Sequence, residues 1–472
     1  MSALLRRIIT STVILPEISL KANTMAHIIP FSGSHVENER IERDAAFVVR
    51  ENKEMNHVSK NIPIKSPIKE QQEEEEGGNE LEPYETMRHK VKQLMLDLFP
   101  DHCTDSVKIY QMRDGRHNRI VGVRLCKKPP GAPWYSIQAI REMIQPCLTG
   151  RKKCTSHSRQ FVLRIPRDPT QNMHHQVTTL AYLGYKLGHP VPKVIVFDAG
   201  AENALGYPYM LQEWLPGQPL SNLWPTLNQA QQLSAIRAIS NIILNIRKIK
   251  NRCPGLISTR NTTYDLKHDI ISTEPIPVPR TLSTTHSMGV STPLSEPQST
   301  KDFLLNLCTR QREYAITAKQ PACDDLWGRI IKMLEILHAL AFIPDSLPFH
   351  LYHGNFNPRN FLASITSKST VEITAIMDWD LALFAPAFLS TSAPSFMWNG
   401  EALVEPEEAG LLEAKRTFEN VVGESFSKEA YCSELVLARR LWPILITGFT
   451  NGRDIFLAEE VVRDFEKLHP MT

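Results

Sequence analysis

The residues best suited to chemistry lie together in one short segment in the second half of the chain. The run from His353 reads Gly354-Asn355-Phe356-Asn357-Pro358-Arg359-Asn360, and Asp378-Trp379-Asp380 follows eighteen residues after Asn360. Taken singly, such residues are typical of a loop held by side-chain turns or of a carboxylate at the end of a strand. Their joint order and spacing on strand–loop–strand segments predict a site. Asn355 cannot take up a proton at neutral pH, although its amide oxygen can orient a hydroxyl group.

This segment resembles the aminoglycoside phosphotransferase and choline kinase-like family, particularly its fungal members. The loop of that family is typically written H-G-D-x-x-P-x-N and is followed by I-x-D-W-[DE]. The resemblance implies a kinase-type loop whose acid deprotonates the acceptor hydroxyl, while a later Asn and Asp hold Mg²⁺ against the nucleotide phosphates. Carried over by position, Asn360 and Asp378 are metal ligands and Asp380 assists them. His353 braces the loop, and Asn355 replaces the catalytic acid.

The resemblance extends toward the N-terminus, where it implies an ATP site. Gly115 occupies the place of the nucleotide-covering turn, but a turn with one glycine is weak as a phosphate loop. Arg164, in the run Phe161-Val162-Leu163-Arg164-Ile165-Pro166, matches the basic residue that reaches the nucleotide phosphates. Glu213 and Leu215 belong to the segment that resembles the hinge against which adenine stacks.

The helix after this strand departs from the family pattern. In the family, that helix usually supplies an acid that pairs with the basic residue on the strand. Gln176 stands at the corresponding place, and no carboxylate occurs between Asp168 and Asp198. This helix therefore cannot supply an ionic partner for Arg164.

These departures from the family pattern leave two candidate functions, and the residue at position 355 distinguishes them. The first is an ATP-dependent phosphotransferase that uses Mg²⁺ and acts on the hydroxyl of a small molecule, with Asn355 orienting that hydroxyl. Losing a general base typically costs roughly 10² to 10⁴ in rate, which leaves a slow kinase. The alternative is a pseudokinase, a nucleotide-binding or interaction module with little or no turnover. A protein kinase fits less well, because the chain lacks an Ala-Pro-Glu segment and has Asp-Trp-Asp in place of Asp-Phe-Gly.

The surrounding elements predict an α+β, bilobal, protein-kinase-like fold with a small β-rich N-lobe and a larger, mainly helical C-lobe. Short strands are predicted at 106–112, 120–125, 160–165, 193–197, 209–214, 351–352 and 371–377. Helices are predicted at 87–98, 137–144, 169–187, 233–249, 324–341 and within 402–468. Asp324 is the predicted N-cap of the helix that follows it.

Composition changes along the chain predict the domain boundaries. Residues 1–85 are predicted to be disordered, because their polar and charged sequence buries too little apolar surface. Residues 86–215 form the nucleotide-binding N-lobe. Residues 216–472 form the C-lobe with the catalytic loop and the substrate side, and a flexible Pro-, Ser- and Thr-rich insertion lies at about 272–300.

The overall composition excludes several classes of protein. Apolar residues make up 42% and charged residues 22%, as in a soluble globular protein, and the net charge of +2 does not favour a nucleic-acid polymer as partner. No uninterrupted apolar stretch reaches the length of a membrane-spanning helix. The eight cysteines contain no CxxC pair, which argues against a thiolate zinc site, and they indicate reduced thiols in an intracellular compartment. His174 and His175 point in different directions on a helix and do not form a metal pair.

The first 25 residues predict a candidate targeting peptide. They contain Arg6, Arg7 and Lys21 but a single acid, Glu17, with Ser and Thr among apolar residues. This composition is typical of a mitochondrial transit peptide, whereas the Arg-Arg pair before an apolar stretch also resembles a poor secretory signal, and a disordered tail fits equally. Pro16 limits any helix there to a short one. The expected location is intracellular, either mitochondrial or cytoplasmic.

Overall fold

The computed structural model of the protein describes residues 82–112, 115, 117–126, 158–168, 171–258, 271–278, 280, 293–318, 323–345, 348–398 and 403–470. The chain divides into two compact units, one of Met1–Leu15 with Asn79–Thr472 and one of Pro16–Gly78. Every described residue belongs to the first unit. The candidate targeting peptide, nearly all of the region predicted as disordered and the helix predicted at 137–144 lie outside the described residues.

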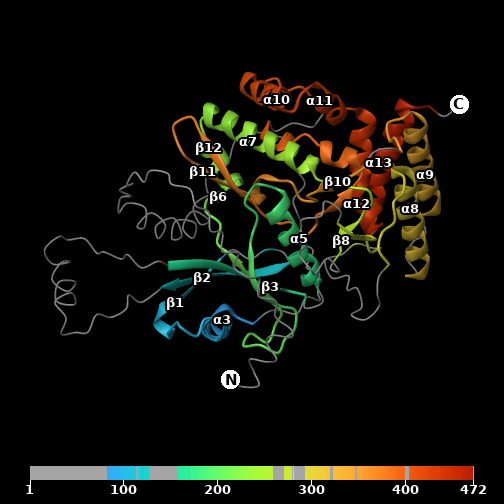
Figure 1. Ribbon diagram of the computed structural model, residues 1–472. Coiled ribbons are helices and arrows are strands. Elements are labelled where there is room, and N and C mark those ends of the chain that lie inside the picture. Colours follow the sequence, from blue (N-terminus) through green and yellow to red (C-terminus); the bar gives the residue numbers. More distant parts are fainter. Residues whose placement is uncertain are drawn as a thin grey trace, which may run out of the picture. The chain divides into compact units, whose positions relative to one another are not determined.

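The N-terminal lobe is built around a five-stranded antiparallel sheet (Figure 1). The strand order is β1-β2-β3-β5-β4, with bounds Val107–Gln111 (β1), Asn118–Cys126 (β2), Ser158–Pro166 (β3), Val194–Asp198 (β4) and Tyr209–Glu213 (β5). Helix α3 (Tyr84–Leu98) places Met87, Val91 and Met95 in the same apolar core as Phe161 and Leu163 of β3. Their spacing of four along α3 puts these apolar side chains on one helical face. Helix α5 (Met173–Lys186) lies between β3 and β4 in the sequence.

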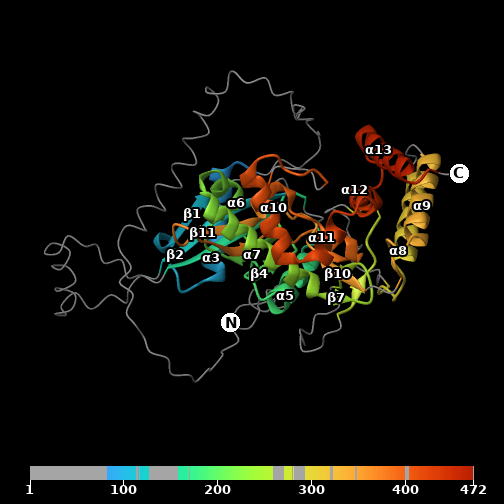
Figure 2. The same ribbon diagram turned by 90° about the horizontal axis from the view of Figure 1, so that it is seen from above.

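The C-terminal lobe is mainly helical (Figures 1 and 2). Its α-helices are α6 (Leu220–Leu223), α7 (Gln229–Lys248), α8 (Thr300–Thr317), α9 (Asp324–Ala339), α10 (Ala409–Val422), α11 (Glu424–Ala430), α12 (Ser433–Thr447) and α13 (Gly452–Leu468). Its short strands are β6 (Gln218–Pro219), β7 (Lys250–Asn251), β8 (Leu256–Ile257), β9 (Thr273–Glu274), β10 (Phe349–Tyr352), β11 (Phe361–Ile365), β12 (Val371–Ile376) and β13 (Leu383–Ala385). Short 3-10 helices occur at Thr104–Ser106 (η1), Trp224–Thr226 (η2), Pro358–Asn360 (η3), Ala387–Thr391 (η4) and Ser395–Met397 (η5).

Helix α7 forms the centre of this lobe. It starts with a capping box in which the Asn228 side chain accepts from the Gln231 backbone amide and the Gln231 side chain accepts from the Asn228 amide, so two exposed donors are satisfied. Ile236, Ile239 and Ile243 recur at helical spacing and are buried. The buried face of α7 packs on β10, β12 and α10, and it thereby supports the strands that carry the candidate site.

Two small antiparallel sheets hold the segment singled out in the sequence. Strand β10 pairs with β7 and β13, while β11 pairs with β12 and with β6. The loop 353–360 runs from the end of β10 to the start of β11, and Asp378 follows β12 by two residues. The Met377 amide donates to the Asn360 carbonyl over 2.8 Å, which brings the end of β12 beside the end of the loop.

The predicted α+β fold, with a β-rich N-lobe and a larger helical C-lobe, is confirmed. Some local predictions differ from the structure. Cys323, with a left-handed backbone at φ 36°, is the N-cap of α9, and Asp324 is its first helical residue. Thr273 and Glu274, at the start of the region predicted as a flexible insertion, are buried and form β9, because they pair with β8. Residues 281–292 of that region lie outside the described residues.

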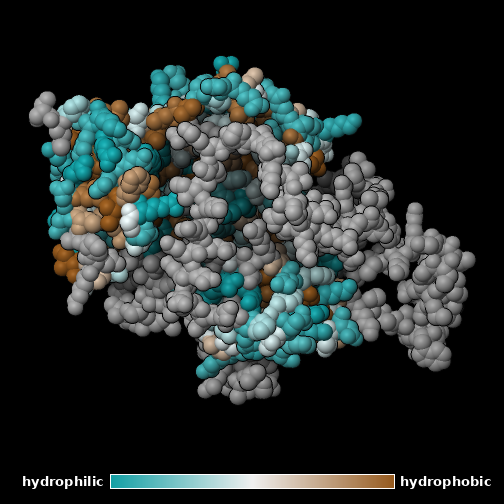
Figure 3. Space-filling model, turned by 180° about the vertical axis from the view of Figure 1, so that it is seen from behind, coloured by the Kyte–Doolittle hydropathy of each residue, from teal (hydrophilic) through white to brown (hydrophobic). Residues whose placement is uncertain are grey.

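None of the described helices is long and apolar enough to cross a lipid bilayer. Hydrophilic residues cover much of the described surface on the face shown in Figure 3, and hydrophobic residues are interspersed among them.

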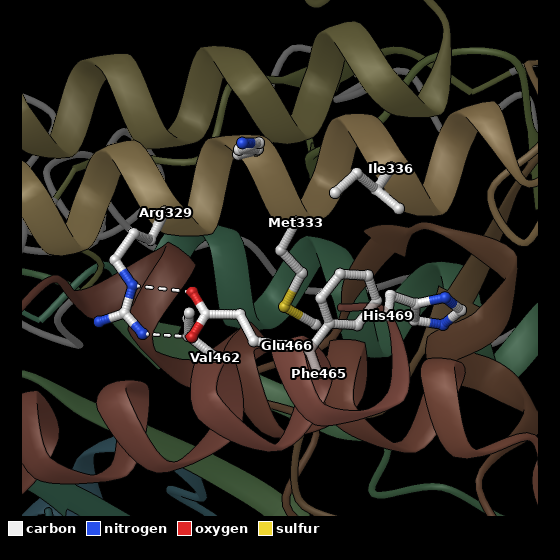
Figure 4. A pocket seen from close by; sticks show the side chains of 8 residues that line it. Arg329, Met333, Ile336, Val462, Phe465, Glu466 and His469 are labelled. Carbon is white, nitrogen blue, oxygen red and sulfur yellow. Dashed lines mark hydrogen bonds and ion pairs between the residues drawn. The ribbon is translucent and has the colours of Figure 1, made fainter. Parts of the chain in front are cut away.

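A small hollow lies between α9 and α13 (Figure 4). Met333 and Ile336 of α9 and Val462 and Phe465 of α13 supply its apolar lining. Beside it, the Arg329 guanidinium donates to both carboxylate oxygens of Glu466, over 3.0 and 2.7 Å. This hollow contains none of the residues of loop 353–360, and its apolar lining indicates a helix–helix packing contact.

Candidate functional site

The loop that carries position 355 depends on a glycine for its path. Gly354 has a φ of +82°, and a Cβ at this position would lie 2.6 Å from Leu381 Cβ and 2.7 Å from the Leu381 carbonyl oxygen. Only glycine adopts this conformation readily and leaves room for the neighbouring backbone. The loop therefore passes in direct contact with the turn that contains Asp378 and Asp380.

His353 is a buried, neutral side chain that braces this contact. Its Nδ1 accepts from the Asn355 backbone amide over 3.2 Å, so Nε2 carries the proton and donates to the Met377 carbonyl over 2.9 Å. Burial lowers the pKa of His353 to about 4, more than the nearby Met377 carbonyl and Asp380 raise it. Its ring also packs on Trp379, with centroids 4.3 Å apart. His353 thus ties the loop to the 377–380 segment and is not available as a base.

Asp378 is the point at which the other loop residues meet. Its Oδ2 accepts from the Asn355 side-chain amide over 2.5 Å and from the Asn360 side-chain amide over 3.3 Å. The Asn360 amide nitrogen also donates to the Asn355 carbonyl over 2.7 Å. Asp378 itself has a left-handed backbone at φ 62°, a strained conformation for a residue other than glycine. Asn355, Asn360 and Asp378 therefore form one hydrogen-bonded group.

The charges at this point favour a cation. Burial and the nearby Asp380 carboxylate raise the pKa of Asp378, while Arg164 and the two amide donors lower it by less. The Asn360 amide oxygen accepts no hydrogen bond from the described part of the chain, and it is a hard ligand of the kind that Mg²⁺ prefers. Within the described ranges, no group of three or more His, Cys, Asp and Glu side chains is placed to hold a metal. One carboxylate and one amide fit Mg²⁺ that is completed by phosphate oxygens and water, as in nucleotide sites.

Arg164 and Asp380 form a bidentate ion pair between β3 and the turn after β12. Arg164 Nη1 and Nη2 donate to the two carboxylate oxygens of Asp380 over 3.2 and 2.5 Å. Both side chains are largely buried, with 14% and 6% exposed. Burial lowers the pKa of Arg164, but the Asp380 carboxylate more than offsets this and the pKa is raised. Asp380, predicted to assist the metal ligands, has both oxygens bound to Arg164.

This ion pair gives Arg164 an acidic partner although α5 carries no carboxylate. Gln176 is buried on α5, and no carboxylate of that helix faces β3. Asp380 instead supplies the acid that Arg164 lacks. Sequence reasoning missed this pairing because the two residues are 216 positions apart.

The remaining residues expected around the nucleotide form no hydrogen bond with this group in the described ranges. Gly115 follows β1, and its amide donates to the Asn118 carbonyl over 2.9 Å. Glu213 ends β5 with an exposed side chain, and Leu215 is half-buried two residues later. Gly217, at φ +108°, leads the chain from this segment to β6, where a Cβ would clash with Thr374. The structure thus brings together Asn355, Asn360 and Asp378 but does not bond Gly115, Glu213 or Leu215 to them.

Asn357 is a member of the group that the sequence did not single out. Its side-chain amide donates to the Asn355 Oδ1 over 3.0 Å, and its own Oδ1 accepts from the Arg359 amide. Both ends of the Asn355 side chain are therefore occupied, by Asn357 at the oxygen and by Asp378 at the nitrogen. The sequence signal for this role of Asn357 was its position two residues after Asn355.

The paired histidines of α5 have separate surroundings. His175 Nδ1 lies 3.1 Å from the Ile257 carbonyl, whereas His174 packs edge-on against Phe197. His175 is buried and His174 is exposed, and their separate contacts are those of structural residues.

Comparison with known proteins identifies the family. The profile of the phosphotransferase enzyme family matches residues 152–389, half of the chain. Among curated proteins, "Altered inheritance of mitochondria protein 9, mitochondrial" of Candida tropicalis is 36% identical over 76 residues, which are 15% of this chain and 12% of the relative. Its counterpart in Saccharomyces cerevisiae is 28% identical over 142 residues, 26% of this chain and 22% of the relative. The matches thus span less than a quarter of the length of these relatives.

Solved structures with a similar chain path are aminoglycoside phosphotransferases. A thermostable mutant of APH(4)-Ia in a ternary complex with ADP and hygromycin B has a TM-score of 0.43 at 15% identity, and the match covers 81% of this chain and all of that chain. The streptomycin–ATP–APH(2")-IIa ternary complex has a TM-score of 0.44 at 10% identity, covering 81% and 97%. The profile match contains β3, the loop and the 378–380 turn, and therefore every residue of the resemblance except Gly115. On this match, the chain belongs to the phosphotransferase enzyme family.

Proposed function

We propose that the protein binds a magnesium–nucleotide complex and transfers a phosphoryl group from ATP to the hydroxyl of a small molecule. The observation that supports this most strongly is the meeting of the Asn355 and Asn360 amides at one oxygen of Asp378. A half-buried carboxylate with a raised pKa, next to an amide oxygen that accepts no hydrogen bond in the described ranges, favours a divalent cation. The cation would neutralise the charge that develops on the transferred phosphate.

In this proposal, each residue of the group has a separate role. Asp378 and the Asn360 oxygen hold the cation. Arg164, held in place by Asp380, contributes positive charge on the nucleotide side of the site, and Gly115, Glu213 and Leu215 border the nucleotide in the 86–215 lobe. The γ-phosphoryl group passes from ATP to the acceptor oxygen, and ADP is the leaving group. The hydroxyl proton leaves to solvent, because Asn355 cannot accept it.

A pseudokinase is the second candidate, and a specific observation favours it. The Asn355 amide donates to Asp378 and its oxygen accepts from Asn357, so each end already has a partner within the chain. In this case the protein binds nucleotide without turnover. The two candidates share the cation site and differ in the rate of transfer.

Calorimetric titration with ATP tests the shared part. We expect the wild-type protein to bind ATP in the presence of Mg²⁺ and to bind it more weakly when EDTA removes the Mg²⁺. Asp378→Asn keeps an oxygen acceptor for both amides but removes the charge, so the effect of Mg²⁺ is expected to vanish. Glu372→Gln, at an exposed position on β12, is the matched control and should bind as wild type does. Absence of any nucleotide binding by the wild type would remove both candidates.

Phosphate-transfer assays then separate the two candidates. Substantial ATP turnover by the wild type, with a panel of small hydroxyl compounds, would exclude the pseudokinase. If turnover appears only in Asn355→Asp, the pseudokinase is supported, because the acid that restores a base also restores the reaction.

We also propose a mitochondrial location. The relatives are named as mitochondrial proteins, and Arg6, Arg7 and Lys21 give the first 25 residues the composition of a transit peptide. A C-terminally tagged chain is expected in mitochondria, and its Arg6→Gln, Arg7→Gln double variant in the cytosol. An unchanged distribution of the double variant would contradict this.

A further inference from the structure

A buried arginine lies near the start of the catalytic loop without an ionic partner. Arg280 is 9% exposed, and its backbone amide donates to the Ile446 carbonyl of α12 over 2.8 Å. Its guanidinium forms no ion pair or hydrogen bond with any residue in the described ranges. Burial lowers the pKa of Arg280 to about 10, and the nearby Tyr352 opposes this. A guanidinium buried to this extent without an acid is costly, because burial removes much of the water around its N–H donors.

A second unsatisfied donor lies on the helix that Arg280 contacts. Trp442 of α12 is 2% exposed, and its indole N–H has no hydrogen-bond partner in the described part of the chain. Arg439, Trp442 and Ile446 follow one another at spacings of three and four, so they share one face of α12. The backbone contact at Ile446 therefore brings Arg280 to the face that carries Trp442.

Tyr352 connects these donors to the catalytic loop. It is the last residue of β10 and immediately precedes His353. Its ring meets that of Trp442 edge to face, with centroids 6.3 Å apart. Its hydroxyl lies within electrostatic range of both Arg280 and Arg439, which lower its pKa against the larger effect of burial.

Arg280 has no acid beside it in the described part of the chain, whereas the Glu429 carboxylate, itself paired with Arg247, acts on Arg439. Arg439 donates to the backbone carbonyls of Phe388, Glu429 and Ala430 and makes no ion pair within the same ranges. Arg280 and Arg439 both lie within electrostatic range of the Tyr352 phenol, whose ring meets the Trp442 indole, and the two guanidinium groups and the indole N–H can only donate. Such a set is complementary to an anion and not to a cation.

We propose that Arg280, Trp442 and Tyr352 form a binding site for a phosphate or carboxylate group. Because Tyr352 adjoins the loop that carries Asn355, this group belongs to the acceptor, which is then an anionic hydroxy compound. That assignment to the acceptor rests on the proposed phosphotransferase function. The anion site itself does not, since it requires neither nucleotide nor Mg²⁺.

Thermal unfolding with inorganic phosphate or acetate, without nucleotide, tests the site. The wild type is expected to gain several degrees in Tm at millimolar concentrations of one of the two, and which one identifies the group. Arg280→Met, which keeps the length and removes the charge, is expected to be at least as stable as wild type without anion and to lose the shift. Arg280→Lys should retain part of it, and Trp442→Phe should weaken the apparent affinity severalfold. Arg453→Gln removes one exposed charge on α13 and should behave as wild type.

Titration in the presence of Mg²⁺ and a non-hydrolysable ATP analogue distinguishes this site from the nucleotide site. The shift should persist with the analogue bound and in Asp378→Asn. Competition between phosphate and the analogue would overturn the proposal, because the phosphate would then occupy the nucleotide site. A shift of equal size in Arg280→Met would also overturn it. Failure of nucleotide binding with an intact phosphate shift would instead reject the proposed function alone.

Discussion

At the scale of single residues, the site is defined by amide groups where the family has an acid. Asn355 is bonded at both ends, and Asn360 donates to the backbone of residue 355 as well as to Asp378. These contacts between side chains and backbone position the loop. The types and spacing of these residues were readable from the sequence, whereas the direction in which each amide points was not, because it depends on the fold of two hairpins.

We expect Gly354→Ala to destabilise the protein more than the same substitution at another glycine with a similar φ. The new Cβ would overlap Leu381, and overpacking of this kind costs about 1–3 kcal/mol beyond the backbone strain. Gly423→Ala is the matched control, since Gly423 has φ +84° and a methyl group added there would have no atom within 4 Å. Chemical denaturation of the two variants measures the difference in their free energies of unfolding. Equal losses of stability would show that Leu381 moves to make room for the new methyl group.

Two buried histidines predict a loss of stability in acid. Burial lowers the pKa of both His350 and His353 to about 4, below the ordinary value of 6.5. Each histidine therefore contributes about 3 kcal/mol to the free energy of unfolding above pH 6.5. This contribution is lost as the pH falls through 4. The raised pKa of Asp378 acts in the opposite direction, because its protonation relieves a buried charge.

Unfolding free energies between pH 7 and 4 check this prediction. His350→Gln removes one titrating group from β10 and leaves the loop untouched, so its stability should fall less steeply with acid. A variant with the same pH dependence as the wild type would show that His350 does not control this window.

At the scale of elements, the ion pair between β3 and the turn after β12 connects the two lobes near the site. Arg164→Met leaves the Asp380 carboxylate buried without a partner, and Asp380→Asn leaves the guanidinium in the same condition. Each is expected to cost about 3–5 kcal/mol. The double variant should cost much less than the sum of the two, because it leaves no unpaired buried charge.

Urea unfolding of the two single variants and the double variant measures this coupling. Arg164→Lys is a useful companion, since a lysine keeps the charge but cannot form two parallel bonds to Asp380. Additive losses in the double variant would contradict the pairing.

The sequence predicted most elements but not all, for physical reasons. The amphipathic spacing in α3, α7 and α9 was sufficient to predict those helices. Helix α8 was missed because a Pro-, Ser- and Thr-rich stretch precedes it, although Ser299 caps it by accepting from the Asp302 amide. Strand β11 is short and is stabilised by its pairing with β12, a tertiary contact that local sequence does not contain.

At the scale of the whole molecule, the α+β fold and the family were predictable because the motifs occur in the right order along the chain. The pairing of Arg164 with Asp380 and the position of Arg280 near Tyr352 were not, since both join residues far apart in sequence. The domain boundaries at 85, 215 and 272–300 stay predictions.

A chain shortened to residues 79–472 is expected to keep its Tm to within about 2 °C. The described core residues of both lobes lie within that range, and residues 79–472 make up the compact unit apart from Met1–Leu15. A change of about 1 kcal/mol shifts the Tm of a chain of this size by only a few degrees. Scanning calorimetry of the full and shortened chains makes the comparison, and a loss of the cooperative transition would show that the removed residues support the fold.

The bond between Asn355 and Asp378 limits how this loop can evolve. An aspartate at 355 would remove the donor and set two like charges 2.5 Å apart, with Asp380 already committed to Arg164. Such a loop would need a bound cation or a shared proton to relieve this repulsion. The amide removes that dependence, so the Asn355–Asp378 bond holds the loop whether or not a metal ion is bound.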